Sequence, residues 1–120
     1  MSTTFLIIEP LPPLFSQAQE EGATLFPHDS KERKTYPMYS GPLSYFPAAL
    51  AAVAKHSYEN NEKHNPGEDM HWSRHKSTDH LDALVRHVME GDLVGAAWRA
   101  LAALQLECEE RGAPMAPAAR

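Results

Sequence analysis

The sequence has a single cysteine, Cys108, among its 120 residues, so it can form no disulfide within the chain. It has no apolar run near the roughly 20 residues that a membrane-spanning helix needs. Its first residues also lack the basic segment of a signal peptide. With 16 acidic and 11 basic side chains the formal net charge is -5, whereas nucleic-acid-binding proteins are normally basic. We therefore expect a single cytoplasmic domain that binds neither a membrane nor a nucleic acid.

Proline and glycine divide the chain into three predicted parts. Residues 1–46 hold six of the ten prolines and show no sustained helical period, which predicts a proline-rich, extended N-terminal arm. The apolar run at residues 5–8 of this arm is expected to pack on the body or on another subunit. Residues 47–111 are predicted to form an all-α domain. Residues 112–120 begin with a helix-stopping glycine and are expected to be disordered.

Three helices are expected in the all-α domain. The first runs over residues 47–63, because proline is favoured in a first turn and the following alanines favour helix. The second opens at Ser77 as N-cap, with Leu81, Leu84, Val85 and Val88 as its apolar stripe. The third runs from Asp92 to residue 111 and is apolar over most of its circumference, which is typical of a helix packed on several sides. The sequence thus predicts a helical bundle completed by oligomerisation, as a dimer or tetramer.

Two pairs of carboxylates bracket the reversal between the first two helices. Glu59 with Glu62, and Asp79 with Asp82, are each three residues apart, so each pair projects from one helix face. An antiparallel arrangement would bring four carboxylates to one end, where they repel unless a cation neutralises them. Oxygen ligands of this kind suit Mg²⁺ or Mn²⁺. The alternative is a solvated helix face on which Asp82 simply pairs with Arg86.

Basic and aromatic side chains surround these acidic pairs. A polyphosphate held by a metal ion also needs cationic side chains nearby to bind its negative charge. The basic residues are Lys55, Lys63, Arg74 and Lys76. Trp72, in the polar loop, is expected either to stack on a base or to anchor the loop in the core. His71 and His75 have the spacing of helical zinc ligands, but they precede Ser77 and no cysteine pair accompanies them, which disfavours zinc.

The order of these motifs resembles the all-α, MazG-like nucleoside triphosphate pyrophosphohydrolases, and within them the phage branch of dATP/dGTP diphosphohydrolases. The resemblance covers residues 41–111 and leaves the first forty residues aside. It is carried by the segments YFPAALAAVA (45–54), NEKHNPGE (61–68), HWSRHKSTD (71–79), DALVRH (82–87) and AAWRALAALQ (96–105). Two positions depart from the wider family: Tyr58 stands where a glutamate is usual, and Asp79 replaces the first glutamate of the second motif.

The resemblance implies a metal-dependent hydrolase that cleaves between the α and β phosphates of a purine nucleotide. It implies dGTP or GTP as substrate, with the monophosphate and pyrophosphate as products, and dGMP supplied for 2-aminoadenine synthesis in the cytoplasm of a phage-infected cell. Glu59 or Glu62 would act on the attacking water, and all four acidic residues would hold Mg²⁺ or Mn²⁺. The phosphates would lie near Lys63, Arg74 and Lys76. The alternative function is a non-catalytic helical phage oligomer with a scaffold or regulatory role.

Overall fold

The computed structural model describes residues 24–119 of the chain. Its elements are α1 (Ser30–Arg33), a π-helical turn η3 (Tyr39–Leu43), α2 (Pro47–His64), α3 (His80–Met89) and α4 (Leu93–Glu110). No strand occurs within the described range, so the all-α prediction is confirmed there. The apolar run at residues 5–8 lies outside the described residues.

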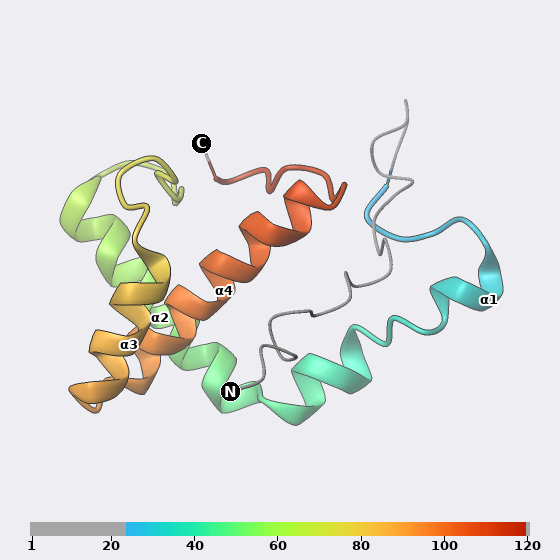
Figure 1. Ribbon diagram of the computed structural model, residues 1–120, viewed down its shortest axis with the longest axis horizontal. Coiled ribbons are helices and arrows are strands. Elements are labelled where there is room, and N and C mark those ends of the chain that lie inside the picture. Colours follow the sequence, from blue (N-terminus) through green and yellow to red (C-terminus); the bar gives the residue numbers. More distant parts are fainter. Residues whose placement is uncertain (1–23, 120) are drawn as a thin grey trace, which may run out of the picture.

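Helix α4 is the centre of the arrangement. It packs against both α2 and α3, whereas the described residues of α2 and α3 do not pack on each other. In the view of Figure 1 the chain rises along α2, turns through a long loop, descends along α3 and then crosses back upward along α4. Helix α1 packs against none of the other elements of residues 24–119, and only η3 connects this segment to α2. The packed part of the described chain is therefore α2, α3 and α4.

Local chemistry explains most of the helix ends. Pro47 occupies the first turn of α2, as predicted. The Asp92 carboxylate caps α4 by accepting from the backbone N–H of Gly95 at 2.9 Å. Gly91 follows α3 with a φ of 76°, a left-handed conformation that disfavours other residues. A side chain at Gly95 would collide with Asp92 and His87, since a Cβ there would lie within 3 Å of both.

The predicted N-cap of α3 is wrong. The cap residue is Asp79, two residues after Ser77, and its carboxylate makes no cap hydrogen bond. The Ser77 hydroxyl instead donates to the Asp79 carboxylate, two residues away, at 2.9 Å and accepts from Arg99 of α4 at 2.8 Å. The Ser77 hydroxyl thus bonds to Arg99 of another helix instead of capping α3.

The face that α3 buries also differs from the predicted stripe. His80 and Ala83 are buried, and the small side chain of Ala83 lets α4 approach closely. Leu81, Val85 and Val88 are exposed by half or more within this chain. Nearby, Met89 is 81% exposed and Leu93 73% exposed. We call these five residues the exposed apolar face.

Buried apolar side chains in residues 24–119 are small. They are Pro27, Ala83, Ala96, Ala102, Ala113 and Ala119. No large side chain of the described range is fully buried. The three helices therefore hold little apolar volume between them, and much apolar surface is left on their outer faces.

The C-terminal residues are packed, in contrast to the expected disorder. After α4 the chain folds back toward the loop between α2 and α3 (Figure 1). Ala113 and Ala119 are buried, and the carbonyl of Ala118 accepts from the backbone N–H of Trp72 at 2.7 Å. The C-terminal segment is thus held by a hydrogen bond to the loop, and the composition of the segment alone does not reveal this partner.

Candidate functional site

A pocket of about 570 Å³ lies between the second half of α2, the loop of residues 65–79 and the first half of α4. The start of α3 and the C-terminal segment complete its wall. Five of the seven histidines line it, together with both tryptophans. Its charged lining residues are Lys76 and Arg99, and no aspartate or glutamate is among them. In a chain with 16 acidic side chains, this composition favours an anionic ligand that carries a ring.

Aromatic rings from four parts of the chain meet at this pocket. The rings of Trp72 and Trp98 have centroids 5.7 Å apart in an edge-to-face arrangement, which is favourable for such pairs. His80 lies 5.9 Å from Trp72 and 6.2 Å from Trp98, and His56 lies 6.4 Å from Trp98. Trp98 also donates from Nε1 to the Ser57 hydroxyl at 3.0 Å, which ties α4 to α2. Trp72 therefore anchors the loop on other rings and also lines the pocket.

A hydrogen-bonded pair, His80 and Arg99, joins α3 to α4 at the pocket wall. Arg99 donates from Nη1 to His80 Nδ1 at 3.1 Å and to the Ser77 hydroxyl at 2.8 Å. Because arginine only donates, Nδ1 must accept and the ring proton resides on Nε2. His80 is only 5% exposed, and Nε2 has no hydrogen-bond partner in the described part of the chain. Burial, and secondarily the Arg99 charge, lowers the pKa of His80, while Asp79 opposes the shift.

The predicted acidic pairs lie outside the pocket lining. Glu59 and Glu62 are exposed, and helical spacing places them on the side of α2 opposite Ser57 and Asn61, which line the pocket. Neither forms an ion pair within residues 24–119. In the same range, no group of three or more His, Cys, Asp or Glu side chains is placed to hold a metal ion. The Mg²⁺ or Mn²⁺ site remains a prediction.

The second acidic pair is also exposed, and one member has a basic partner. Arg86 donates to the Asp79 carboxylate at 2.8 Å, where the sequence had suggested a pair with Asp82. This hydrogen bond, followed by the one from Ser77, lowers the pKa of Asp79 to about 2. Asp79 is therefore ionised at neutral pH, in the form that a cation needs. Asp82 is exposed on the first turn of α3 and makes no ion pair within the described range.

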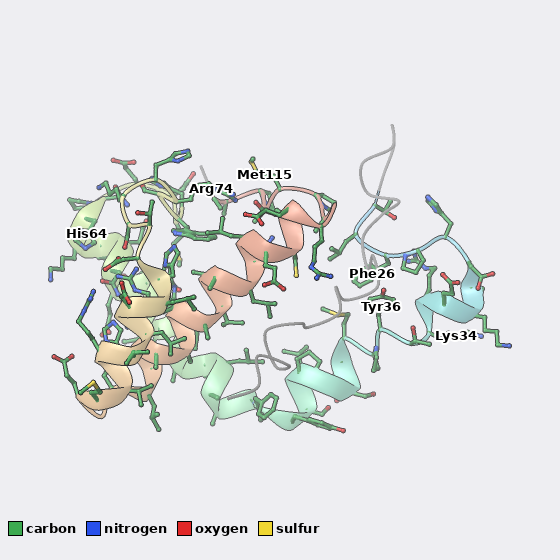
Figure 2. The ribbon with its side chains drawn as sticks, in the orientation of Figure 1. Phe26, Lys34, Tyr36, His64, Arg74 and Met115 are labelled. Carbon is green, nitrogen blue, oxygen red and sulfur yellow. The ribbon has the colours of Figure 1, made fainter. Side chains whose placement is uncertain are left out.

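The predicted basic residues separate into two groups. Lys76 lines the pocket, whereas Lys55 and Lys63 are exposed on α2 and are not part of the lining. Arg74 does not line the pocket either, because it forms a two-pronged ion pair with Glu109 at 2.6 and 3.1 Å. Figure 2 shows Arg74 beside the C-terminal segment that carries Met115. Arg74 holds the loop to α4, because three of its five N–H groups donate to the Glu109 carboxylate and the Ala119 carbonyl and its charge is already paired.

Sequence reasoning missed His80 and Arg99. Arg99 is a single arginine in the middle of an alanine-rich helix, a position where a charge must find a partner. That signal indicates a buried polar contact. It does not identify His80, which lies 19 residues earlier in the chain.

Comparison of the chain with protein-family models, with curated proteins and with solved structures finds no match. Within residues 24–119, no helix is long and apolar enough to cross a membrane.

Proposed function

We propose that this chain is a metal-dependent nucleotide pyrophosphohydrolase that binds a purine nucleoside triphosphate, preferably dGTP or GTP, in the pocket. The observation that carries this proposal is the lining of two tryptophans, Lys76 and Arg99 with no carboxylate. Aromatic rings hold a base by stacking, and fixed cationic groups hold phosphates. The products are the nucleoside monophosphate and pyrophosphate, and the resemblance suggests dGMP for 2-aminoadenine synthesis in a phage.

The start of α3 supports a position for the phosphates. Lys76 lies in the pocket lining three residues before Asp79, and its ammonium group makes no hydrogen bond within residues 24–119. The N-terminus of α3 carries no side-chain cap, so its backbone N–H groups and its dipole favour an anion there. A ligand with its base among the tryptophans and its phosphates at Lys76 therefore extends toward the second acidic pair.

The carboxylates of the two acidic pairs are suitable ligands for a hard cation, but the described chain does not bring the two pairs together at one site. Each pair offers two carboxylates on one helix turn, and only Asp79 has an ion-pair partner within residues 24–119. We propose that Glu59, Glu62, Asp79 and Asp82 hold Mg²⁺ or Mn²⁺, with Glu59 or Glu62 as the base. A bound divalent ion lowers the pKa of a water molecule and neutralises phosphate charge.

A homo-oligomer is part of this proposal. Leu81, Val85 and Val88 of the exposed apolar face share one side of α3 by their helical spacing, and exposed apolar surfaces mark interaction sites. We expect light scattering to give a dimer or a dimer of dimers at micromolar concentration.

Val85→Glu is expected to shift the protein toward the monomer, because it places a charge in the interface. Glu90→Gln, an exposed change on the same helix, serves as control; a wild-type monomer of 13.4 kDa would refute the oligomer.

Product analysis tests the reaction. Incubation with dGTP and Mg²⁺ is expected to yield dGMP and intact pyrophosphate, because Lys76 stabilises the more highly charged leaving group. Lys76→Ala is expected to slow turnover about tenfold or more and to leave divalent-ion stabilisation unchanged. Lys55→Ala, which alters an exposed lysine outside the pocket, is the matched control. Accumulation of dGDP and phosphate, or of deoxyguanosine and triphosphate, would contradict the mechanism.

One observation favours the second candidate, a non-catalytic helical oligomer with a scaffold or regulatory role. Glu59 and Glu62 face away from the pocket, and Asp79 is already paired with Arg86. The two candidates differ in their response to metal, because an enzyme of this type is stabilised by Mg²⁺ or Mn²⁺ and a scaffold is not. A ligand at a hundred times its dissociation constant adds about 2.7 kcal/mol to the free energy of unfolding.

A further inference from the structure

Arg99 is a partly buried arginine whose charge has no carboxylate partner in the described residues. Each of the other arginines in residues 47–119 lies within 3.8 Å of a carboxylate oxygen. They are Arg74, Arg86 and Arg111. Arg99 instead lines the pocket, which has no carboxylate in its lining. A cation that is partly withdrawn from water and unpaired favours the binding of an anion.

The guanidinium of Arg99 is held in one orientation by three contacts. Nη1 donates to the Ser77 hydroxyl at 2.8 Å and to His80 Nδ1 at 3.1 Å. One face of the group lies on the Trp98 ring, with 5.7 Å between the guanidinium carbon and the ring centre. The Ser77 hydroxyl also donates to Asp79, so it stands between Arg99 and that carboxylate. The group is thus oriented before a ligand arrives, which reduces the loss of entropy on binding.

One edge of the Arg99 guanidinium is free. Nη2 and Nε make no hydrogen bond within residues 24–119, and both are accessible to solvent, whereas His80 Nε2 is buried. The N–H groups of Nε and Nη2 point the same way, and this pair of donors matches two oxygens of one phosphate. A two-pronged, charge-assisted contact of this kind is stronger than neutral hydrogen bonds, and lysine does not reproduce its geometry.

Arg99 connects the tryptophans to the segment that carries Lys76. It stacks on Trp98, and its partner Ser77 directly follows Lys76 in the chain. In the proposed complex the base lies among the tryptophans and the leaving pyrophosphate lies at Lys76. The phosphate between them is the α phosphate, which stays on the nucleoside after cleavage.

We infer that Arg99 binds the α phosphate of the nucleotide through Nε and Nη2, and that Ser77 and His80 are positioning residues for its guanidinium. This inference rests on the proposed nucleotide function. It divides the cationic residues of the pocket by role, because Arg99 holds the phosphate that remains in the monophosphate product and Lys76 holds the pyrophosphate that leaves.

Titration calorimetry of the full-length chain with deoxyguanosine, dGMP and inorganic pyrophosphate tests the inference. None of the three is a substrate, so Mg²⁺ is present throughout. The wild type is expected to bind dGMP about tenfold more tightly than deoxyguanosine, because the phosphate adds a charge-assisted contact. Arg99→Lys is expected to remove most of this preference and to leave the affinities for deoxyguanosine and pyrophosphate unchanged. Arg33→Lys, on α1 and outside the pocket, is the control and is expected to leave all three affinities unchanged.

Substitutions of His80 test the positioning role. His80→Leu removes the acceptor of Arg99 Nη1, whereas His80→Asn supplies an amide oxygen in place of Nδ1. We expect His80→Leu to reduce the preference for dGMP over deoxyguanosine severalfold and His80→Asn to restore most of it. Both variants shorten the side chain, so a purely structural role for His80 would not separate them. Ser77→Ala, which removes the other acceptor of Nη1, is the milder variant if a substitution of His80 or Arg99 prevents folding, and it is expected to reduce the same preference.

The outcomes separate this inference from the proposed function. Equal weakening of deoxyguanosine and dGMP by Arg99→Lys would show a structural role for Arg99, and weakening of pyrophosphate alone would place Arg99 at the leaving group; either result overturns the inference. Equal preference for dGMP in His80→Leu and the wild type would overturn the positioning role. If the wild type binds deoxyguanosine and dGMP equally, the α-phosphate role fails and the nucleotide function stands. If it binds none of the three ligands, the proposed function itself fails.

Discussion

Arg74→Ala is expected to lower the free energy of unfolding by about 3 kcal/mol. The Arg74 and Glu109 side chains are only 10% and 12% exposed, and their two hydrogen bonds join the loop to the end of α4. Arg74 also donates to the carbonyl of Ala119 at 3.0 Å and stacks on Trp72 at 5.2 Å. Its removal leaves the Glu109 carboxylate poorly solvated and unpaired, which costs more than the pair itself contributes. Urea unfolding followed by circular dichroism measures the change.

Arg86→Ala is the matched control for this experiment. Arg86 and Asp79 also form an ion pair at 2.8 Å, but their side chains are 61% and 47% exposed, so water solvates whichever partner remains. We expect little change in unfolding free energy for this variant. Equal losses for Arg74→Ala and Arg86→Ala would contradict a burial-dependent role for Arg74.

The Arg74–Glu109 pair also predicts how the free energy of unfolding depends on pH. Hydrogen bonding to Arg74, the largest cause, lowers the pKa of Glu109 to about 2 from its usual 4.5, with smaller support from Gln105 and the backbone of Ala116. A carboxylate with a depressed pKa in the folded state stabilises the fold above its unfolded pKa. That stabilisation is lost as the pH falls from about 4.5 toward 2. Glu109→Gln is expected to be less stable at pH 7 and to lose less stability over this acidic range; parallel pH profiles would contradict the assignment.

Asp82→Asn is expected to abolish nucleotide hydrolysis and the stabilisation by Mg²⁺ or Mn²⁺. Without metal, the variant should be as stable as the wild type or more so, because the substitution removes the negative charge that lies three residues from Asp79 at the start of α3. Asp82 is exposed, with no ion pair in the described chain, so its loss leaves no buried group unpaired. Thermal unfolding with and without each ion, beside a product assay with dGTP, gives both results.

Asp69→Asn provides the comparison for Asp82→Asn. Asp69 is an exposed aspartate of the loop and is not one of the proposed metal ligands. Its replacement by asparagine is the same chemical change as Asp82→Asn. It should keep both activity and metal response. If Asp82→Asn instead retains activity, or loses several kcal/mol of stability without metal, Asp82 is a structural residue and the metal assignment is wrong.

The sequence by itself determined where α2, α3 and α4 form and how most of them end. It missed α1 and η3, which lie in residues 1–46, where an extended arm was predicted. Proline at residue 47, the glycine after α3 and the Asp92 cap act through backbone geometry and hydrogen bonds within a few residues, so they can be read from local order. The same holds for the placement of Trp72 and Lys76 in one loop, and both of them line the pocket. These features depend on neighbours along the chain.

Only the tertiary structure decided which side chains meet. Ser77 does not cap α3, because its hydroxyl serves Arg99 from another helix, and Arg74 is paired with a glutamate 35 residues away. The C-terminal segment is ordered by carbonyl groups that accept from the loop. Helix α3 buries His80 and Ala83 rather than its aliphatic stripe, since close packing on α4 favours a small side chain and Arg99 supplies a partner for the imidazole. Contacts between segments far apart in sequence satisfy these polar groups, and no local pattern specifies them.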